Sequence, residues 1–401
     1  MRQHIIAGLD IGTHALKMGI ARTNEESGDL EIIDVMSEES FGVRKGTVVN
    51  TEELARRIFS LKTRMESTHD QQIQGVYVNV GGSHLYVVSS HGIVAVSRAD
   101  GQISQEDVDR VLLAAQTFSL PRNKEILDVF PQQYIVDGES GIKEVVNMKG
   151  VRLEVDVLAV CGFSPYVKNL TEAVLAGGLE VLDVIPSPLA AAPAVLTPQQ
   201  KEIGAALLDI GGGCTSLAVF EEGNLIHAAV FPVGSDNMTN DIAIGLRTEY
   251  DVAERVKIEY GSCNEKPGKR TGKIALSSGE ELVFSQSLLT GILDARVKEI
   301  FQLVLKELKK ISKDGMLPAG VVLTGGGVKL PGLVEFAKKE FKLPVRVGTP
   351  QGLLTAETHP EYMGLMGLIA AGSESEESVM VSQKPSEMAK KIKKFFKSFI
   401  P

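Results

Sequence analysis

The chain contains few cysteines and few aromatic side chains. Its 401 residues include three cysteines, no tryptophan and only 5% aromatic residues. Cys161, Cys214 and Cys263 lie far apart, and no pair has the spacing of metal ligands. An odd number of cysteines is also a poor basis for a disulfide framework. The sequence therefore favours a protein of a reducing compartment.

Long hydrophobic runs and an excess of positive charge are missing as well. No run of about 18 apolar residues occurs, so no membrane-spanning helix is expected. Residues 1–4 lead directly into a strand pattern, without the charged and apolar regions of a secretory signal. The net charge of −9 argues against nucleic acid as a partner, because nucleic-acid binding needs a basic face.

Two common nucleotide motifs, GxxxxGK[ST] and GxGxxG, do not occur. Glycine, by contrast, is abundant, with 40 residues, and three glycine-rich turns each follow a buried strand. The first is Asp10-Ile11-Gly12-Thr13, with Lys17 shortly after it. The second is Asp209 to Thr215, which contains Gly211, Gly212 and Gly213, and the third is Thr324-Gly325-Gly326-Gly327.

Tight turns of this kind present backbone N–H groups to phosphate oxygens, and glycine lets the ligand approach closely. Asp10 and Asp209 cannot face phosphate directly, so they would act through Mg²⁺ and its waters. Thr13 adds a hydroxyl, and Lys17 can reach a phosphate as a point charge. Each turn alone is also typical of an ordinary hairpin or loop; three in this order indicate a nucleotide site.

The first two turns belong to an internal repeat. Residues 9–13 and 208–213 each combine the end of a buried strand, an aspartate and a glycine turn that leads to a second strand. A repeat of a whole subdomain indicates duplication, with a ligand held between the copies. Elsewhere, Thr51–Arg64 is expected to be helical with Thr51 as N-cap, and Ser104–Thr117 begins with a capping box.

These motifs resemble those of the superfamily of actin, sugar kinases and heat-shock chaperone ATPases. Asp10–Thr13 resembles its first phosphate loop, Asp209–Thr215 its second and Thr324–Gly327 its adenosine loop. Within the superfamily, the chain is similar to the bacterial cell-division FtsA family. This resemblance extends over residues 4–372 and includes Gly92–Val96, Ile103–Val108 and Phe130–Tyr134 of a characteristic inserted subdomain.

The resemblance implies an α/β fold of two duplicated ribonuclease-H-like, actin-like domains with the FtsA-type insertion and a C-terminal amphipathic helix. The implied divisions are 1–83 with 161–195 (subdomain 1A), 84–160 (the inserted subdomain 1C), 196–233 with 303–372 (subdomain 2A), 234–302 (subdomain 2B), 373–386 (a flexible linker) and 387–401 (the amphipathic helix).

The same resemblance implies ATP and Mg²⁺ as cofactors. The expected nucleotide-binding residues are Asp10, Gly12, Thr13, Lys17, Asp209, Gly211, Gly212, Gly213, Thr215, Gly234, Glu254, Lys257, Gly325, Gly326 and Gly327, with Asp10 and Asp209 also at the metal. Glu254 and Lys257 would contact ribose or base. One position departs from the chaperone branch: Ser187 stands where that branch has a glutamate near the terminal phosphate. Serine is no general base at pH 7, so ATP hydrolysis is expected to be slow at most.

The C-terminal tail carries an independent signal. Taken as a helix, residues 387–400 place Met388, Ile392, Phe395, Phe396 and Phe399 on one stripe, while Lys391, Lys394 and further lysines fill the remaining arc. A 14-residue helix is about 21 Å long, too short to cross a hydrocarbon core of about 30 Å. It can lie in the interface of an anionic membrane. The alternatives are a helix packed on the domain and a solvated basic tail.

The FtsA resemblance implies a protein that binds the C-terminal peptide of FtsZ, polymerises with itself, recruits other division proteins and acts at the septum on the cytoplasmic side of the membrane. Arg296 is the expected contact for the FtsZ peptide, with apolar help from Leu289, Ile292 and Val297. Alternatively, Arg296 pairs with Glu299 on its own helix. Two other functions stay open: a pilus-assembly adaptor like PilM, which would not need the tail, and an ATPase or kinase of the same superfamily.

Overall fold

The computed structural model describes residues 5–24, 29–263, 270–276 and 279–381, with side chains to residue 375. The amphipathic helix expected at 387–401 lies outside these residues, as do Met388, Lys391, Ile392, Lys394, Phe395, Phe396 and Phe399. None of the described helices is long and apolar enough to cross a bilayer.

The first half of the chain builds five strands of a six-stranded sheet, and a short strand near the C-terminus adds the sixth. Its order is β11-β6-β1-β2-β3-β19, from strands Ile6–Ile11 (β1), Ala15–Thr23 (β2), Leu30–Glu39 (β3), Gly75–Val80 (β6), Glu180–Pro186 (β11) and Leu353–Leu354 (β19). The first three strands pair antiparallel, whereas β1, β6 and β11 are parallel neighbours. Every residue of β1 is buried, because helices cover both faces of the sheet. Helices Thr51–His69 (α1) and Ser164–Ala176 (α3) pack together beside it, and Met363–Val381 (α11) packs on β1, β2 and β6.

The second half repeats this arrangement. Strands Ala205–Ile210 (β12), Thr215–Glu221 (β13), Asn224–Phe231 (β14), Val321–Thr324 (β17) and Val345–Val347 (β18) form a sheet of order β14-β13-β12-β17-β18. As in the first half, the leading strands pair antiparallel and a later strand joins β12 in parallel. The long helix Gln286–Lys310 (α9) and helix Leu333–Phe341 (α10) pack on one another. The predicted duplication is therefore confirmed.

An inserted subdomain extends from the first half. Strands Tyr86–Ala95 (β7), Arg152–Phe163 (β10), Lys124–Val136 (β8) and Glu139–Ile142 (β9) form an antiparallel sheet in that order. Helix Gln105–Ala115 (α2) packs on β7, and a β-carbon at Gly92 would lie 2.4 Å from the Val111 carbonyl oxygen. The predicted capping box is confirmed, with Ser104 and Asp107 capping each other's backbone.

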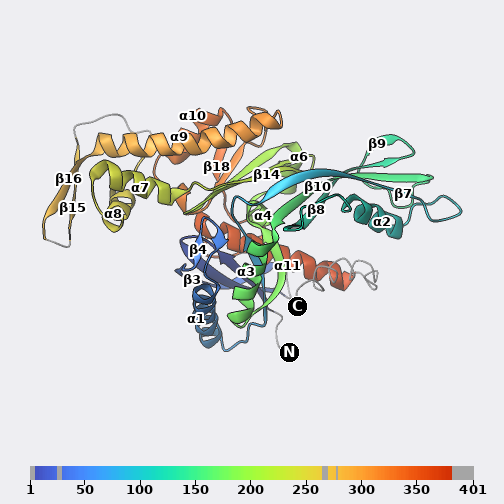
Figure 1. The fold of residues 1–401 in the computed structure, drawn as a ribbon, viewed down its shortest axis with the longest axis horizontal. Coiled ribbons are helices and arrows are strands. Elements are labelled where there is room, and N and C mark those ends of the chain that lie inside the picture. The colour runs from blue at the N-terminus through green and yellow to red at the C-terminus, as the bar shows by residue number, and fades with distance from the viewer. Residues whose placement is uncertain (1–4, 25–28, 264–269, 277–278, 382–401) are drawn as a thin grey trace.

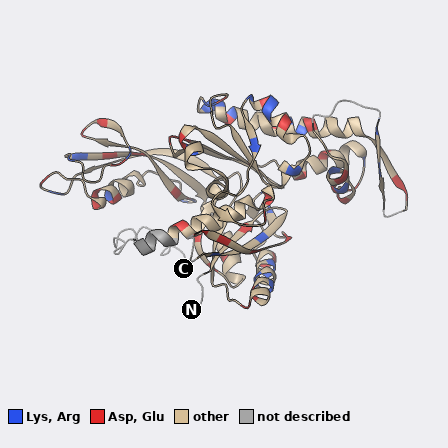
Figure 2. Ribbon diagram, turned by 180° about the vertical axis from the view of Figure 1, so that it is seen from behind, with Lys and Arg blue, Asp and Glu red and all other residues tan. Residues whose placement is uncertain are grey.

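A second small subdomain lies at the opposite end of the molecule (Figure 1). It contains helices Ser235–Leu246 (α7) and Tyr250–Tyr260 (α8), the hairpin Thr271–Ala275 (β15) and Glu281–Ser285 (β16), and the start of α9. Lys and Arg as well as Asp and Glu are scattered along the ribbon of both halves (Figure 2). The remaining described elements are Val43–Arg44 (β4), Thr47–Val48 (β5), Ser187–Ala190 (α4), Ala192–Val195 (α5), Pro198–Ile203 (α6) and the 3₁₀ turns Gly326–Lys329 (η1) and Pro360–Tyr362 (η2).

Three expectations require correction. The N-cap of α1 is Asn50 rather than Thr51, because the Asn50 side chain accepts the Glu53 amide. The linker expected from residue 373 is wrong up to Val381, since α11 continues to that residue; no glycine or proline interrupts the chain between Gly372 and Pro385. The boundary that placed residues up to 372 in the second half is also wrong for α11 and β19, which pack on the first-half sheet.

Helix α11 approaches the short helices α4 and α5 so closely that one position has no room for a side chain. A β-carbon at Gly367 would lie 1.8 Å from the Ala190 carbonyl oxygen. We expect Gly367→Ala to lower the free energy of unfolding by about 2–3 kcal/mol, because overpacking forces the backbone to move. Gly291→Ala is the matched control: it lies in α9 with open space around it, so the same change should raise stability by about 0.5–1 kcal/mol. Chemical denaturation measures both, and equal effects of the two variants would contradict this packing.

Candidate functional site

The first glycine turn joins β1 to β2 and is fixed by backbone contacts. The Gly12 amide donates to the Ala15 carbonyl at 3.1 Å, which closes the turn. Thr13 Oγ1 accepts the amide of Gly46 at 2.9 Å. This bond ties the turn to the β4–β5 hairpin and leaves the Thr13 hydroxyl proton free to donate to a ligand.

Asp10 lies at the end of β1 in a polar cluster. Its carboxylate accepts from Lys17 Nζ at 2.7 Å and from Asn79 Nδ2 at 2.8 Å. The Asn79 side chain also accepts the Ile11 amide at 2.7 Å. Burial alone would lower the pKa of Lys17, but the carboxylates of Asp10 and Asp209 outweigh this effect and raise it. Lys17 is therefore a charged partner of Asp10 rather than a lysine free for phosphate.

The second glycine turn contacts the first directly. A β-carbon at Gly213 would lie 2.7 Å from Thr13 Oγ1, so the Thr13 side chain of the first turn packs on the bare backbone of the second. Gly234 packs on the same turn, since a β-carbon there would lie 2.2 Å from the Gly212 carbonyl oxygen. Thr215 Oγ1 donates to the Val233 carbonyl at 2.8 Å, and the Ser235 amide donates to the Gly211 carbonyl at 2.9 Å. The turn and the start of α7 thus form one rigid unit.

Asp209 lies at the end of β12, in the position that Asp10 occupies in the first half. Its carboxylate accepts from Thr324 Oγ1 at 2.9 Å. Burial raises the pKa of Asp209, and the hydrogen bond from Thr324 opposes that rise. A divalent cation nearby would favour the ionised carboxylate. Among the described residues, no three His, Cys, Asp or Glu side chains gather to hold a metal by themselves, so Mg²⁺ here would depend on water and phosphate ligands.

The third glycine turn lies against β12. A β-carbon at Gly325 would lie 2.5 Å from the Ile210 carbonyl oxygen, and one at Gly327 would lie 2.6 Å from the Ile210 side chain. At Gly326 the same atom would meet nothing closer than 3.9 Å. Gly325 and Gly327 therefore serve packing, whereas Gly326 offers bare backbone to a ligand.

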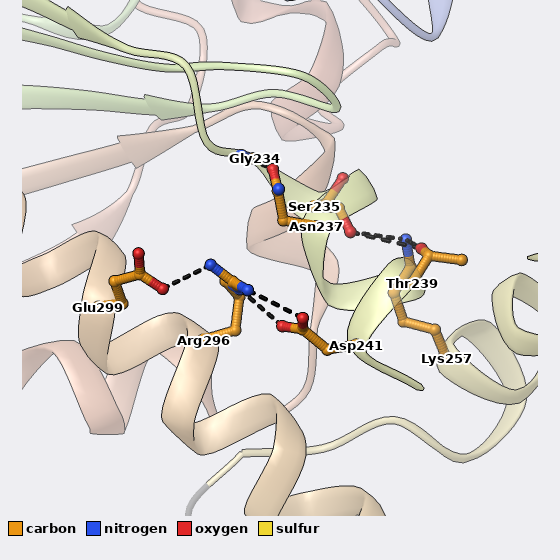
Figure 3. A network of polar contacts seen from close by, with 8 residues as sticks. All are labelled: Gly234, Ser235, Asn237, Thr239, Asp241, Lys257, Arg296 and Glu299. Atoms are coloured by element: carbon orange, nitrogen blue, oxygen red, sulfur yellow. Dashed lines mark hydrogen bonds and ion pairs between the residues drawn. The ribbon is translucent and has the colours of Figure 1, made fainter. Parts of the chain in front are cut away.

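Glu254 and Lys257 lie one turn apart on α8 and pair at 2.7 Å. Lys257 Nζ also contacts Thr239 Oγ1 at 2.7 Å and donates to the Ser235 carbonyl at 3.3 Å on α7 (Figure 3). The pair thus stands beside the residues that follow Gly234. The structure brings the predicted residues of the first and second turns into contact and places the third turn and the Glu254–Lys257 pair on adjoining elements.

Sequence reasoning missed two residues of this site. Asn79 bridges Asp10 and the Ile11 amide. Asp236 lies beside the second turn, since a β-carbon added to Gly212 would be 2.9 Å from Asp236 Oδ1. Burial raises the pKa of Asp236, while His14 and Lys257 oppose the rise. Asn79 is a polar residue just before the end of a buried strand, and this pattern could have identified it as a candidate site residue from the sequence. Asp236 has no comparable local pattern.

Ser187 lies at the start of α4, next to this cluster. Its Oγ is 3.3 Å from Asn79 Nδ2 and would be 3.0 Å from a β-carbon on Gly81. The hydroxyl therefore occupies the neighbourhood of Asp10 without bringing a second carboxylate there.

Arg296 is engaged within the second small subdomain. It donates to both carboxylate oxygens of Asp241 on α7, at 2.6 and 2.8 Å, and to Glu299 at 2.5 Å (Figure 3). The hydrogen bond to Asp241 raises the pKa of the guanidinium. Some of its three expected apolar neighbours were expected to face the core, and these are Leu289 and Val297, which are buried there; Ile292 is half-buried. Spacing along α9 could not show this, because the helix is covered over a wide arc.

Comparison with known proteins places this architecture in a family. The family model "Cell division protein FtsA" matches residues 206–367, and "SHS2 domain inserted in FTSA" matches residues 82–161. Cell division protein FtsA of Pseudomonas aeruginosa is 36% identical over 382 residues, which cover 94% of this chain and 91% of that protein. FtsA of Bacillus subtilis is also 36% identical, with 91% and 82% covered.

Solved structures show the fold. A PilM–PilN type IV pilus biogenesis complex aligns with a TM-score of 0.66 at 18% identity, covering 92% of this chain and 98% of that chain. MreB5 of Spiroplasma citri bound to ADP aligns with a TM-score of 0.56 at 14% identity, covering 94% and 99%. The actin-like fold with an inserted FtsA-type subdomain is thus confirmed, and by its identity and coverage the chain belongs to the FtsA family of cell division proteins.

Proposed function

We propose that this chain is an ATP-binding, actin-like protein that tethers FtsZ filaments to the inner face of the cytoplasmic membrane at the division septum. The observation that carries the proposal is the contact of two glycine turns through Thr13 and Gly213, each turn preceded by an aspartate on a buried strand. Membership of the FtsA family supports the role in division. The similarity to MreB5 structures bound to ADP and to AMPPNP supports a nucleotide at the glycine turns.

In this proposal, Gly12, Thr13, Gly211, Gly212 and Gly213 would contact the phosphates, and Asp10 and Asp209 would hold Mg²⁺, mostly through water. Glu254 and Lys257 meet the ribose or base, and Gly326 lies beneath it. The oxygen-rich cluster around Asp10 and Asp209 suits a hard cation such as Mg²⁺. Thr215, Gly234, Gly325 and Gly327 hold the turns in place, and Lys17 neutralises Asp10.

Removal of the second aspartate tests this site. We expect Asp209→Ala to weaken Mg-ATP binding by about tenfold or more, because a charge-assisted contact to the metal is lost. Asp314→Ala is the matched control, since Asp314 is exposed and lies in the loop after α9, away from the glycine turns. Calorimetric titration measures both variants, and an unchanged affinity in Asp209→Ala would contradict the assignment.

Turnover of the nucleotide is proposed to be slow. Ser187 stands beside Asn79 where a carboxylate would orient water, and a serine hydroxyl is no general base at neutral pH. ATP would then act as a conformational ligand that favours one arrangement of the two halves, in keeping with a polymerising scaffold. A kinase or fast ATPase of the same superfamily is the alternative, and steady phosphate release from ATP would favour it.

Membrane attachment is assigned to the C-terminal tail from its sequence. The tail pairs an aromatic stripe with lysines, and each interfacial Lys contributes about 1 kcal/mol on anionic lipid while each buried Phe adds about 2 kcal/mol. A pilus-assembly adaptor like PilM would not need such a tail, so the tail favours the division role over that alternative. Recruitment of later division proteins would follow from this position at the membrane.

Placing negative charge on the aromatic stripe tests whether the tail attaches the protein to the membrane. We expect Phe395→Glu with Phe396→Glu to release the protein from vesicles that contain anionic lipid, because burial is lost and repulsion is added. The control is Phe59→Glu, which alters a phenylalanine on α1 that is already 59% exposed. Co-sedimentation with vesicles measures binding. If the double variant sediments like the unaltered protein, the tail is not the anchor.

The FtsZ peptide is proposed to bind at α9, where Arg296 can fork to a carboxylate. Because Asp241 and Glu299 already hold this guanidinium, an acidic peptide would have to take over one of their places. The bond to Asp241 therefore competes with the peptide in this proposal, and the strength of that bond would set the affinity.

Two variants with opposite expected effects test this contact. Arg296→Glu should weaken binding of the FtsZ peptide by about 2 kcal/mol or more. Asp241→Asn should strengthen that binding, because the guanidinium loses its charged partner. Lys298→Glu, an exposed position on the same helix, controls for general charge. Titration with the peptide decides: equal affinity of unaltered protein, Arg296→Glu and Asp241→Asn means that Arg296 does not receive the peptide.

A further inference from the structure

The β4–β5 hairpin places a lysine next to the proposed phosphate site. Val43 pairs with Val48 and Arg44 with Thr47, so Lys45 and Gly46 form the two-residue turn. Both turn residues have positive φ, 48° and 74°, as a type I′ turn requires. Gly46 fits this geometry, but a lysine is unusual where asparagine, aspartate or glycine is preferred. The backbone therefore does not explain the presence of Lys45.

The turn is packed against the parts of the site that face the terminal phosphate in this proposal. The Gly46 amide donates to Thr13 Oγ1 at 2.9 Å, which ties the hairpin to the first glycine turn. A β-carbon on Gly46 would lie 2.7 Å from the Gly82 amide nitrogen, and one on Gly81 would lie 3.0 Å from Ser187 Oγ. The hairpin turn thus lies between the first glycine turn and the end of β6, with Ser187 on the far side.

Within the described residues, the charge of Lys45 has no carboxylate partner. The side chain is exposed, and no carboxylate in the described part of the chain pairs with it. Burial raises the pKa of the Cys214 thiol to about 12, and the Lys45 ammonium opposes that rise. Because Cys214 belongs to the second glycine turn, Lys45 lies within electrostatic range of that turn. Lys17, by contrast, is held by Asp10 at 2.7 Å.

We infer that Lys45 is the basic residue that contacts the terminal phosphate of a bound nucleoside triphosphate. The inference rests on the proposed nucleotide site and specifies which state of the nucleotide that site prefers. Lys45 also borders a hollow of about 460 Å³ with Arg44 and Ser83; its long stem lets the ammonium turn from this hollow toward the phosphate. A nucleoside diphosphate lacks the phosphate that Lys45 would meet, so the residue confers a preference for the triphosphate.

Lys45→Asn separates this role from a structural one. Asparagine suits the first position of a type I′ turn better than lysine does, so the variant should fold with an unchanged or higher melting temperature. Its affinity for Mg-ATP should fall at least tenfold, and its affinity for Mg-ADP should change less than twofold. Two controls are available: Lys342→Asn, another exposed lysine with positive φ (55°), and Arg44→Gln, which removes the neighbouring charge. Both should bind ATP within about threefold of the unaltered protein, since general electrostatic effects of exposed charges are screened.

Calorimetric titration of the full chain with both nucleotides gives distinct outcomes. If Lys45→Asn keeps its ATP affinity, or loses ATP and ADP affinity equally, the assignment of Lys45 is overturned while the nucleotide site stands. If Arg44→Gln loses as much ATP affinity as Lys45→Asn, the assignment is also overturned, because the loss would then follow from the overall positive charge of the hairpin and not from Lys45 itself. If the unaltered protein binds neither nucleotide, the proposed site itself is wrong, and the role of Lys45 with it.

Discussion

The rest of the candidate site depends on the direct contact of two glycine turns. Gly213 approaches Thr13 so closely that a β-carbon would collide with its hydroxyl, and Gly234 approaches the Gly212 carbonyl in the same way. Each turn follows a buried strand that lies at the centre of its own sheet. The two halves therefore meet with the Thr13 side chain against the bare backbone of Gly213, and the aspartates at the strand ends are brought toward one another. A side chain at Gly213 would push the two halves apart, and one at Gly234 would push the start of α7 away from the second glycine turn.

A polar network surrounds this contact and links it to distant elements. Asn79 and Lys17 hold Asp10, while Thr324 holds Asp209. From Gly234 the chain enters α7, which contacts Lys257 near its start and Arg296 further along through Asp241 (Figure 3). One helix thus touches both the proposed nucleotide side and the proposed peptide side. This arrangement gives a physical route for coupling between the two sites, provided that α7 has two arrangements that each ligand favours differently.

Much of the fold could be predicted from the sequence because the turns are local. Asp10–Thr13 and Asp209–Gly213 reveal the duplication, since strand, aspartate and glycine lie next to each other in the chain. The capping box at Ser104 is likewise a local pattern. Pairings between distant residues could not be predicted in this way: Asn79 with Asp10, Asp236 with Gly212 and Asp241 with Arg296 depend on how the elements pack. The helical course of residues 373–381 was missed because a polar, serine- and glutamate-rich composition is compatible with both linker and helix.

The central claim is that three separate turns close on one nucleotide, and hydrogen exchange tests it most directly. Amide exchange of the full chain would be followed with and without Mg-ATP. The account predicts slower exchange in all three turns, residues 10–13, 209–215 and 324–327, with no change in the inserted sheet formed by β7, β8, β9 and β10. Protection of none of the turns at saturating nucleotide, or of the inserted sheet instead, would contradict it.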